Sequence, residues 1–247
     1  GELDDISDVT IFIHLAGESI AAPIRWSTQK KTSIYQSRVH ATKALVENIL
    51  NVSHKIHTFI CASATGVYPD SNEIMTEESD LGTSFLADVV TEWAAACSPL
   101  KQTMRVCNAR FGAILHPNGG MIQRLKPLMK VGGLGPIGSG NQYFSWIALD
   151  DALRAIYTIC ANSELSGPVN VVSPTPKTQC NWIKEWATYA NRPAIARLPE
   201  KVVQRVMGDM GNELLLKSSR IIPKKLKEVG FRFQCETMTE TADFYAL

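Results

Sequence analysis

Two short, almost wholly apolar runs constrain the fold of this chain more than any other feature. They are Val9–Ala16, which reads VTIFIHLA, and Thr58–Ala64, which reads TFICASA. A strand covered on both faces has this pattern, whereas a strand with one face in water alternates between apolar and polar residues. A helical stretch from about Ser27 to Leu50 separates the two runs. A connection of this length indicates parallel strands joined by a crossover helix.

The same alternation continues along the chain to about residue 172. A helix is expected at about 83–96, a strand at 104–110, a further strand at 143–149 and a helix up to about Ala161 that Asp150 or Asp151 caps. The last strand of the series is expected at 169–172. The pattern predicts an α/β, Rossmann-like, doubly wound parallel sheet that contains the strands at 9–16, 58–64, 104–110 and 169–172.

The alternation of strands and helices ends at about Ser173, and the rest of the sequence is mainly helical in pattern. Helices are expected near 178–190, 199–207, 212–218 and 223–229, with little strand between them, and Gly230 ends the last helix. The chain is therefore expected to form two domains. Residues 1–172 are the Rossmann-like dinucleotide-binding domain, with a mobile flap at about 113–145, and residues 173–247 are a small, helix-rich, substrate-side domain.

Charge and cysteine usage exclude several classes of protein. The net charge is +1 and no apolar run reaches the length of a membrane span, so no membrane association is expected. Residues 201–232 hold eight basic and three acidic side chains. We interpret this stretch as a solvated helical face rather than a nucleic-acid surface. The six cysteines are scattered singly, which indicates small buried side chains in a reducing compartment, either the cytoplasm or an organelle matrix.

Small residues follow two of the predicted strands. Leu15, Ala16 and Gly17 end the first strand, and Arg110 and Gly112 flank the end of the third. Ligands of open parallel sheets bind beyond the carboxyl ends of the strands, where small side chains let a flat ring or a ribose approach the backbone. Ala16 and Gly17 have this property, and Leu15 beside them is a candidate cofactor contact with them; Arg110 and Gly112 are expected to frame the nicotinamide and the substrate. A glycine such as Gly17 is also what a tight turn requires.

A hydroxyl-rich motif ends the second strand. It reads ASATGVY, and it contains Ser63 and Tyr68. Ser63 is expected to point into the same crevice, where it can bind a substrate oxygen or the cofactor, and Tyr68 is a candidate proton donor. Serine and threonine at strand ends also commonly cap backbone groups, which is the alternative interpretation.

Two familiar signatures are excluded. Residues 133–138 match G-x-G-x-x-G, but a helix precedes the match, a strand follows it and Pro136 lies inside it. A phosphate-binding loop needs a strand before it and a helix that opens at its end, so this match is expected to be a loop. The five histidines have no carboxylate or thiol partners at metal-ligand spacing, so no metal is expected.

Several motifs together resemble a known family. They are HLAGE, Ser37, Arg38 and Thr42 of the next helix, SATGVY, RFGAIL, GGLGPIGSGNQYFSWIALDD, GPVNVVSP and RIIPKKLKEVGFRF. This combination resembles the atypical extended short-chain dehydrogenases/reductases called epimerase family proteins, which are similar to NAD-dependent epimerases and dehydratases. The resemblance implies a Rossmann fold, NADP(H) in preference to NAD(H), and Arg38 as a cofactor contact. Helix packing and surface pairing are the alternative for Ser37, Arg38 and Thr42.

The sequence departs from this family in two ways. Family members open with a strand, a glycine-rich loop and a helix, so a first unit of about 60 residues is expected upstream of this sequence. The wider class also uses a Tyr-x-x-x-Lys pair on the helix after SATGVY. Aligned by eye, Ala87 stands at the tyrosine position and Thr91 at the lysine position.

Two functions remain open at this stage. The first is an NAD(P)-binding oxidoreductase or epimerase-like enzyme that acts on a small polar substrate through Ser63 and Tyr68. The second is a catalytically silent, Rossmann-like structural or accessory subunit of an assembly, which the absent Tyr/Lys pair favours. A homodimer or a larger assembly is compatible with both functions.

Overall fold

A computed structural model describes residues 5–247, and its centre is a four-stranded parallel sheet. The strands are β1 (Ile11–His14), β2 (Thr58–Ala64), β4 (Arg105–Phe111) and β8 (Gly167–Val171), in the order β1-β2-β4-β8. Every neighbouring pair is parallel. The predicted α/β Rossmann-like sheet and its four strands are confirmed, although β1 is shorter than the apolar run that contains it.

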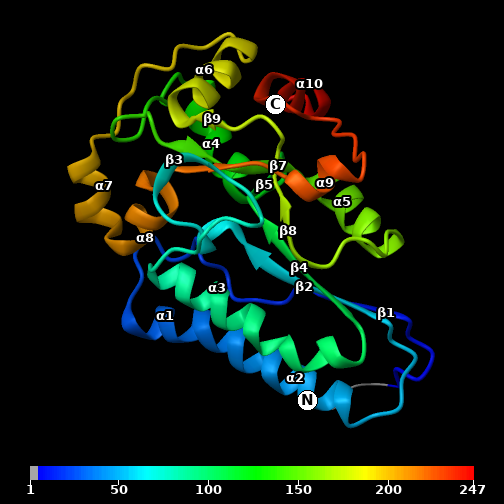
Figure 1. Ribbon diagram of the computed structural model, residues 1–247. Helices are drawn as coiled ribbons and strands as arrows, with labels where there is room; N and C mark the ends of the chain where they lie inside the picture. The colour runs from blue at the N-terminus through cyan, green and yellow to red at the C-terminus, as the bar shows by residue number, and fades with distance from the viewer. Residues whose placement is uncertain (1–4) are drawn as a thin grey trace.

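Helices cover both faces of this sheet (Figure 1). One face carries α1 (Thr28–Tyr35), α2 (Ala41–Leu50) and α3 (Phe85–Ala96), and the other carries α5 (Leu149–Ala161) and α9 (Lys224–Glu228). Between α1 and α2, the segment Gln36–His40 is π-helical, so the chain from Thr28 to Leu50 is helical throughout. Short 3-10 turns lie at Thr65–Val67 and Ser98–Gln102.

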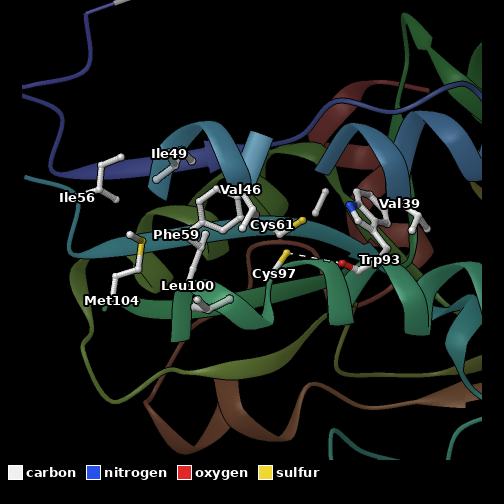
Figure 2. Packing of buried hydrophobic residues seen from close by; sticks show 12 residues of the cluster. Val39, Val46, Ile49, Ile56, Phe59, Cys61, Trp93, Cys97, Leu100 and Met104 are labelled. Atoms are coloured by element: carbon white, nitrogen blue, oxygen red, sulfur yellow. Dashed lines mark hydrogen bonds between the residues drawn. The ribbon is translucent and has the colours of Figure 1, made fainter. Parts of the chain in front are cut away.

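The apolar runs form strands because both of their faces find a core. In β2, Phe59 and Cys61 pack toward Trp93 of α3, whereas Ile60 packs on the opposite side of the sheet with α5. Figure 2 shows the first of these cores, in which the thiols of Cys61 and Cys97 lie beside each other. Cys97 donates a hydrogen bond to the carbonyl oxygen of Trp93, with a separation of 3.6 Å. These thiols pack as small apolar groups.

A second body lies beyond the carboxyl ends of the sheet strands (Figure 1). Its helices are α4 (Gly120–Lys130), α6 (Gln179–Tyr189) and α10 (Met238–Tyr245). Its short strands are β5 (Ala113–His116), β6 (Tyr143–Phe144), β7 (Trp146–Ala148) and β9 (Lys177–Thr178), which pair as β5-β7 and β6-β9. The predicted strand at 143–149 is thus divided at Ser145, and both halves lie outside the central sheet.

The segment 113–145 packs into this second body. Leu115, Ile122 and Met129 are fully buried beside Trp182 and Trp186 of α6. The sequence marked this segment as a mobile flap because of its glycines. The structure shows that its apolar side chains pack in one core with side chains of the C-terminal region. The mobility of the segment stays a prediction.

The C-terminal region contains the predicted helices, and it also forms a helix and a strand pairing that the sequence did not reveal. The helices are α6, α7 (Glu200–Met207), α8 (Asp209–Gly211) with the π-helical segment Asn212–Leu216, and α9. Gly230 follows α9 with a φ of 74°, a backbone conformation that favours glycine. The two unforeseen elements are α10 and a parallel pair formed by β3 (Ser71–Met75) and β10 (Ser219–Ile221).

The prediction that Asp150 or Asp151 caps α5 was wrong. The helix begins at Leu149, and Ala148 occupies the N-cap position without a side-chain hydrogen bond. The fully buried carboxylate of Asp151 instead accepts the backbone N–H groups of Gln234 and Cys235, each at 2.9 Å. Asp151 therefore fastens the C-terminal segment to α5.

Two further expectations concern loops and surfaces. Residues 133–138 are loop and turn with one isolated bridge, and no helix opens there, so the rejection of the G-x-G-x-x-G match as a strand–loop–helix unit is confirmed. The basic residues of 201–232 do not share one face, since Arg220 lies over the ring of Tyr143 and Lys224 pairs with Glu78. Within residues 5–247, no helix has both the length and the apolar character that a membrane crossing requires.

Candidate functional site

A cleft of about 320 Å³ lies at the carboxyl ends of β1, β2 and β4, between the central sheet and the second body. It contains six of the candidate residues from the sequence: Leu15, Ala16, Gly17, Arg38, Ser63 and Gly112. Residues Tyr143–Ser145 and 213–219 close it from the side of the second body. The strand ends meet there because all the strands of the sheet are parallel.

Two glycines set the dimensions of the cleft. A Cβ atom on Gly17 would lie 3.1 Å from Cζ of Arg38, and a Cβ atom on Gly112 would lie 2.9 Å from the carbonyl carbon of Ser145. The first glycine lets the guanidinium group reach the end of β1. The second lets the 143–145 segment pack on the end of β4.

Of the three residues Ser37, Arg38 and Thr42, only Arg38 lines the cleft. Its guanidinium carbon lies 5.3 Å from the centre of the Trp93 ring, and its hydrogen bonds to Ile34 O and Ser37 Oγ are long, at 3.4 Å. Burial lowers the pKa of Arg38. Thr42 is fully buried between His14 and Trp93, both of which hydrogen-bond its hydroxyl, so Thr42 is a packing residue.

Among the described residues, Ser63 carries the one buried hydroxyl of the cleft that lacks a hydrogen-bond partner. Its side chain is buried, and its Oγ atom makes no hydrogen bond within residues 5–247. A buried hydroxyl without a partner costs about 1–3 kcal/mol, so the position favours a group that meets a ligand oxygen. The alternative role that the sequence left open, a backbone cap, is not seen.

Tyr68 and Arg110 lie outside the lining of the cleft. Tyr68 is fully buried; its hydroxyl accepts a hydrogen bond from Nη1 of Arg110 and donates one to Oδ1 of Asn170, both at 2.7 Å. The guanidinium carbon of Arg110 also lies 5.0 Å from the centre of the Tyr68 ring. Burial raises the pKa of Tyr68, and the charge of Arg110 opposes this rise. This geometry favours a structural role for both residues over proton donation and cofactor contact.

Tyr68→Phe tests this assignment. Removal of the hydroxyl leaves Arg110 and Asn170 each without one buried hydrogen bond, so we expect the free energy of unfolding to fall by about 1–3 kcal/mol. Urea denaturation measures this change. Ligand affinity of the cleft should stay within twofold of the parent protein. A variant of unchanged stability that had lost its turnover would instead support the proton-donor role.

Helix α3 presents an apolar wall to the cleft. Leu86 and Val90, which are four residues apart, line it, whereas Ala87 is buried in the core and Thr91 is exposed. Ala87 and Thr91, the positions at which the Tyr/Lys pair was expected, do not line the cleft. Val89 and Trp93 line it as well, so α3 offers two i, i+4 pairs to the cleft, and neither pair contains a tyrosine or a lysine.

Sequence reasoning missed the polar groups that the C-terminal region contributes. Nζ of Lys217 donates a hydrogen bond to Gly66 O at 3.1 Å, and burial lowers the pKa of this lysine. Oε2 of Glu213 accepts hydrogen bonds from the hydroxyl of Ser84 at 2.7 Å and from the N–H group of Leu86 at 3.1 Å. The second bond gives a partner to one of the free N–H groups at the start of α3. Lys217 belongs to the basic stretch already noted, but nothing in the sequence places it at the end of a strand about 150 residues earlier.

Comparison with known proteins decides the family. The profile of the NAD dependent epimerase/dehydratase family matches residues 2–172, which is more than half of the chain. The chain belongs to this family. A second profile, a domain of unknown function called DUF1731, matches residues 198–243, and the resemblance inferred from the sequence motifs is confirmed.

Relatives in the epimerase family come from distant organisms. An epimerase family protein of Mycobacterium tuberculosis is 37% identical over 248 residues, which cover 99% of this chain and 81% of that protein. The chloroplastic SDR39U1 homologue of Arabidopsis thaliana is 30% identical over 228 residues, which cover 91% of this chain and 65% of that protein. These matches do not test the expected glycine-rich unit upstream, which stays a prediction.

Solved structures of epimerase family members agree with the fold. The human epimerase family protein SDR39U1 (isoform 2), solved with NADPH, superposes with a TM-score of 0.92 at 25% identity, covering 99% of this chain and 83% of that one. The nucleoside-diphosphate sugar epimerase of Corynebacterium glutamicum superposes with a TM-score of 0.75 at 30% identity, covering 95% of this chain and 46% of that one.

Proposed function

We propose that this epimerase family protein binds NADP(H) in the cleft at the ends of β1, β2 and β4, and that its turnover of ordinary sugar-nucleotide or alcohol substrates is slow. The observation that carries the proposal is the buried, unpartnered Ser63 hydroxyl in a cleft that the Arg38 guanidinium also lines. The human relative solved with NADPH supports NADP(H) over NAD(H).

The residues of the cleft fit part of a dinucleotide. Ala16 and Gly17 leave room for a flat ring or a ribose against the end of β1, and Arg38 can donate hydrogen bonds to a phosphate beside Gly17. Glu18 is the nearby carboxylate whose charge acts on Arg38, but Glu18 forms its ion pair with Lys30, which leaves the guanidinium N–H groups of Arg38 able to donate to a ligand. When bound, NADP(H) supplies or accepts a hydride at a substrate carbon.

The protein's own groups have separate tasks in this proposal. The hydroxyl of Ser63 donates a hydrogen bond to the substrate oxygen. The ammonium group of Lys217 adds positive charge near that oxygen, and the side chains of Leu86 and Val90 exclude water. None of these groups reproduces the Tyr/Lys pair, in which a lysine charge favours the tyrosine anion. General acid–base catalysis contributes roughly 10²–10⁴ in rate, so its loss predicts slow chemistry.

A second candidate function rests on the apolar wall that α3 presents to the cleft. With Leu86 and Val90 at the positions that face it, the protein would be a catalytically silent subunit that binds a dinucleotide, or no ligand, within an assembly. The Lys217 charge and the unpartnered Ser63 hydroxyl favour the enzyme.

Titration of the protein with NADPH and with NADH, followed by a substrate screen, tests both functions. We expect NADPH to bind more tightly than NADH, and UDP-glucose and simple alcohols to turn over slowly. Ser63→Ala should lower any turnover by about tenfold, which is the effect of one lost hydrogen bond, and leave NADPH affinity within threefold.

Ser163→Ala serves as the control, because Ser163 is exposed and lies outside the cleft. Fast turnover that Ser63→Ala abolishes would refute slow chemistry and establish an ordinary enzyme. Absence of NADPH and NADH binding would support the silent subunit.

A further inference from the structure

A second, larger cavity adjoins the cleft. Its volume is about 510 Å³, and it lies between α4, α6 and the loop at 195–198. A cavity of this size is in the range that holds small molecules. Most of its lining is apolar: Met121, Leu125, Leu128, Leu134, Ile137, Phe144, Trp182, Ile183, Leu198, Leu214 and Leu215.

Two of the polar side chains that line the second cavity, Gln142 and Gln179, hydrogen-bond backbone groups of its own walls. The amide of Gln142 donates to Ile137 O at 3.0 Å and to Leu215 O at 2.9 Å. Oε1 of Gln179 accepts the N–H group of Ile137 at 3.0 Å. Arg197 is exposed at the rim, where its Nε atom donates to Gly138 O at 3.1 Å. These contacts fix the walls. Trp182 also lines the cavity, and its Nε1 atom is buried without a hydrogen-bond partner within residues 5–247, so one N–H donor of the lining is free.

The second cavity and the cleft share one boundary. Tyr143, Phe144, Leu214 and Lys217 line both of them. Of these four side chains only Lys217 is charged, and its Nζ atom is held on the cleft side by Gly66 O. A molecule that spans the boundary therefore has its polar end near Lys217 and its remainder among apolar side chains.

We propose that the substrate side of this protein binds a molecule with an apolar aliphatic or alicyclic body and a single carbonyl or hydroxyl oxygen, with the body in the second cavity and the oxygen directed toward Lys217 and Ser63. The orientation of the oxygen rests on the proposed NADP(H) site; the chemistry of the body does not. This substrate class differs from the small polar substrate that the sequence suggested.

The same geometry disfavours a nucleoside diphosphate sugar in the second cavity. A diphosphate needs several cationic or N–H donors, because burial of phosphate charge without partners is costly. Arg197 and Lys217 are the charged residues of the lining, and both already donate to backbone oxygens. An uncharged body instead gains from contact with the leucine, tryptophan and phenylalanine side chains.

A homologous series of ketones tests this inference by binding rather than by turnover. The probes are 2-hexanone, 2-octanone and 2-decanone, with UDP-glucose as the rival ligand. Isothermal titration, and the fluorescence of Trp182 in the lining, measure affinity with and without NADPH. We expect binding to tighten by about fourfold for each added methylene group that is buried, and UDP-glucose to bind more weakly than 2-decanone.

Leu128→Asp is the decisive variant, and Val131→Asp is its matched control. Leu128 lines the second cavity with 47% of its surface exposed, so a carboxylate there can be hydrated without unfolding α4. Val131 follows the end of α4, is 79% exposed and lies outside the lining. We expect Leu128→Asp to weaken 2-decanone binding about tenfold or more and Val131→Asp to change it less than twofold. Neither should alter NADPH affinity or the melting temperature beyond a few degrees.

The outcomes separate the two proposals. Affinity that does not rise with chain length, a rise that Leu128→Asp leaves unchanged, or preferred binding of UDP-glucose would each overturn the apolar-substrate inference, whatever NADPH does. A rising ketone series that Leu128→Asp suppresses supports the inference. If such a series appears without any NADPH binding, the proposed cofactor function fails while the assignment of the second cavity stands.

Discussion

Arg38→Met is expected to weaken NADPH binding by about tenfold to a hundredfold. Hydrogen bonds to charged groups contribute about 1.5–3 kcal/mol, and each 1.4 kcal/mol corresponds to a factor of ten in affinity. Methionine retains an unbranched apolar stem that can pack on Trp93, so the loss reports the guanidinium rather than the packing. Fluorescence titration at two salt concentrations measures the effect, and the loss should be smaller at high salt because ions screen the phosphate.

The matched control is Arg192→Met, because Arg192 is exposed and lies outside both cavities. Its NADPH affinity should equal that of the parent protein. If Arg38→Met melts normally and binds NADPH with unchanged affinity, Arg38 serves helix packing and surface pairing, and the phosphate contact proposed for it is wrong.

Asp151→Ala is expected to lower the free energy of unfolding by about 3 kcal/mol. The carboxylate is fully buried, and it accepts the N–H groups of Gln234 and Cys235 as well as Nη1 of Arg154 at 2.8 Å. Alanine leaves these donors without a partner; the N–H group of the buried Cys235 then costs about 1–3 kcal/mol, whereas Gln234 and Arg154 are exposed enough to be partly hydrated. Chemical denaturation measures the change.

Asp243→Ala is a suitable comparison, because Asp243 is an exposed aspartate of α10 and should change stability by less than 0.5 kcal/mol, roughly the effect of an ordinary surface substitution. A loss below about 1 kcal/mol in Asp151→Ala would show that water replaces the carboxylate at the 234–235 backbone. A second readout is hydrogen exchange, which should speed up at Cys235 in Asp151→Ala and not in Asp243→Ala.

The central sheet could be predicted from the sequence because its strands are buried on both faces. Ile60 and Cys61 face opposite cores, so neither face of the strand needs polar residues. The resulting apolar run is typical of a buried strand. The pair β3-β10 had no such signal. Asn72 and Glu73 of β3 are exposed, and β3 pairs with residues about 146 positions later.

The candidate site likewise contains some residues that the sequence could predict and others that it could not. Gly17, Ser63 and Gly112 could be found because each lies at, or just after, the end of a strand that the sequence marks. Lys217 could not, because it reaches the cleft from a π-helical segment and a loop of the C-terminal region. The sequence could not show the surroundings of Tyr68 for a related reason. This tyrosine lies in the right motif, but its partner Asn170 comes from β8, and that hydrogen bond turns the hydroxyl into the core.

The π-helical turn at Gln36–His40 changes the direction in which side chains point before and after it within one continuous helix. An α-helix advances about 100° per residue, so one extra residue in a turn rotates everything after it by about that angle. The offset allows one rod to direct Arg38 toward the cleft and Val46 and Ile49 toward the core. Deletion of a single residue here would convert the segment to regular α-helix. We expect this change to rotate α1 relative to α2 and to move Arg38 away from Gly17. The number of residues between Tyr35 and Ala41 therefore matters as much as their identity.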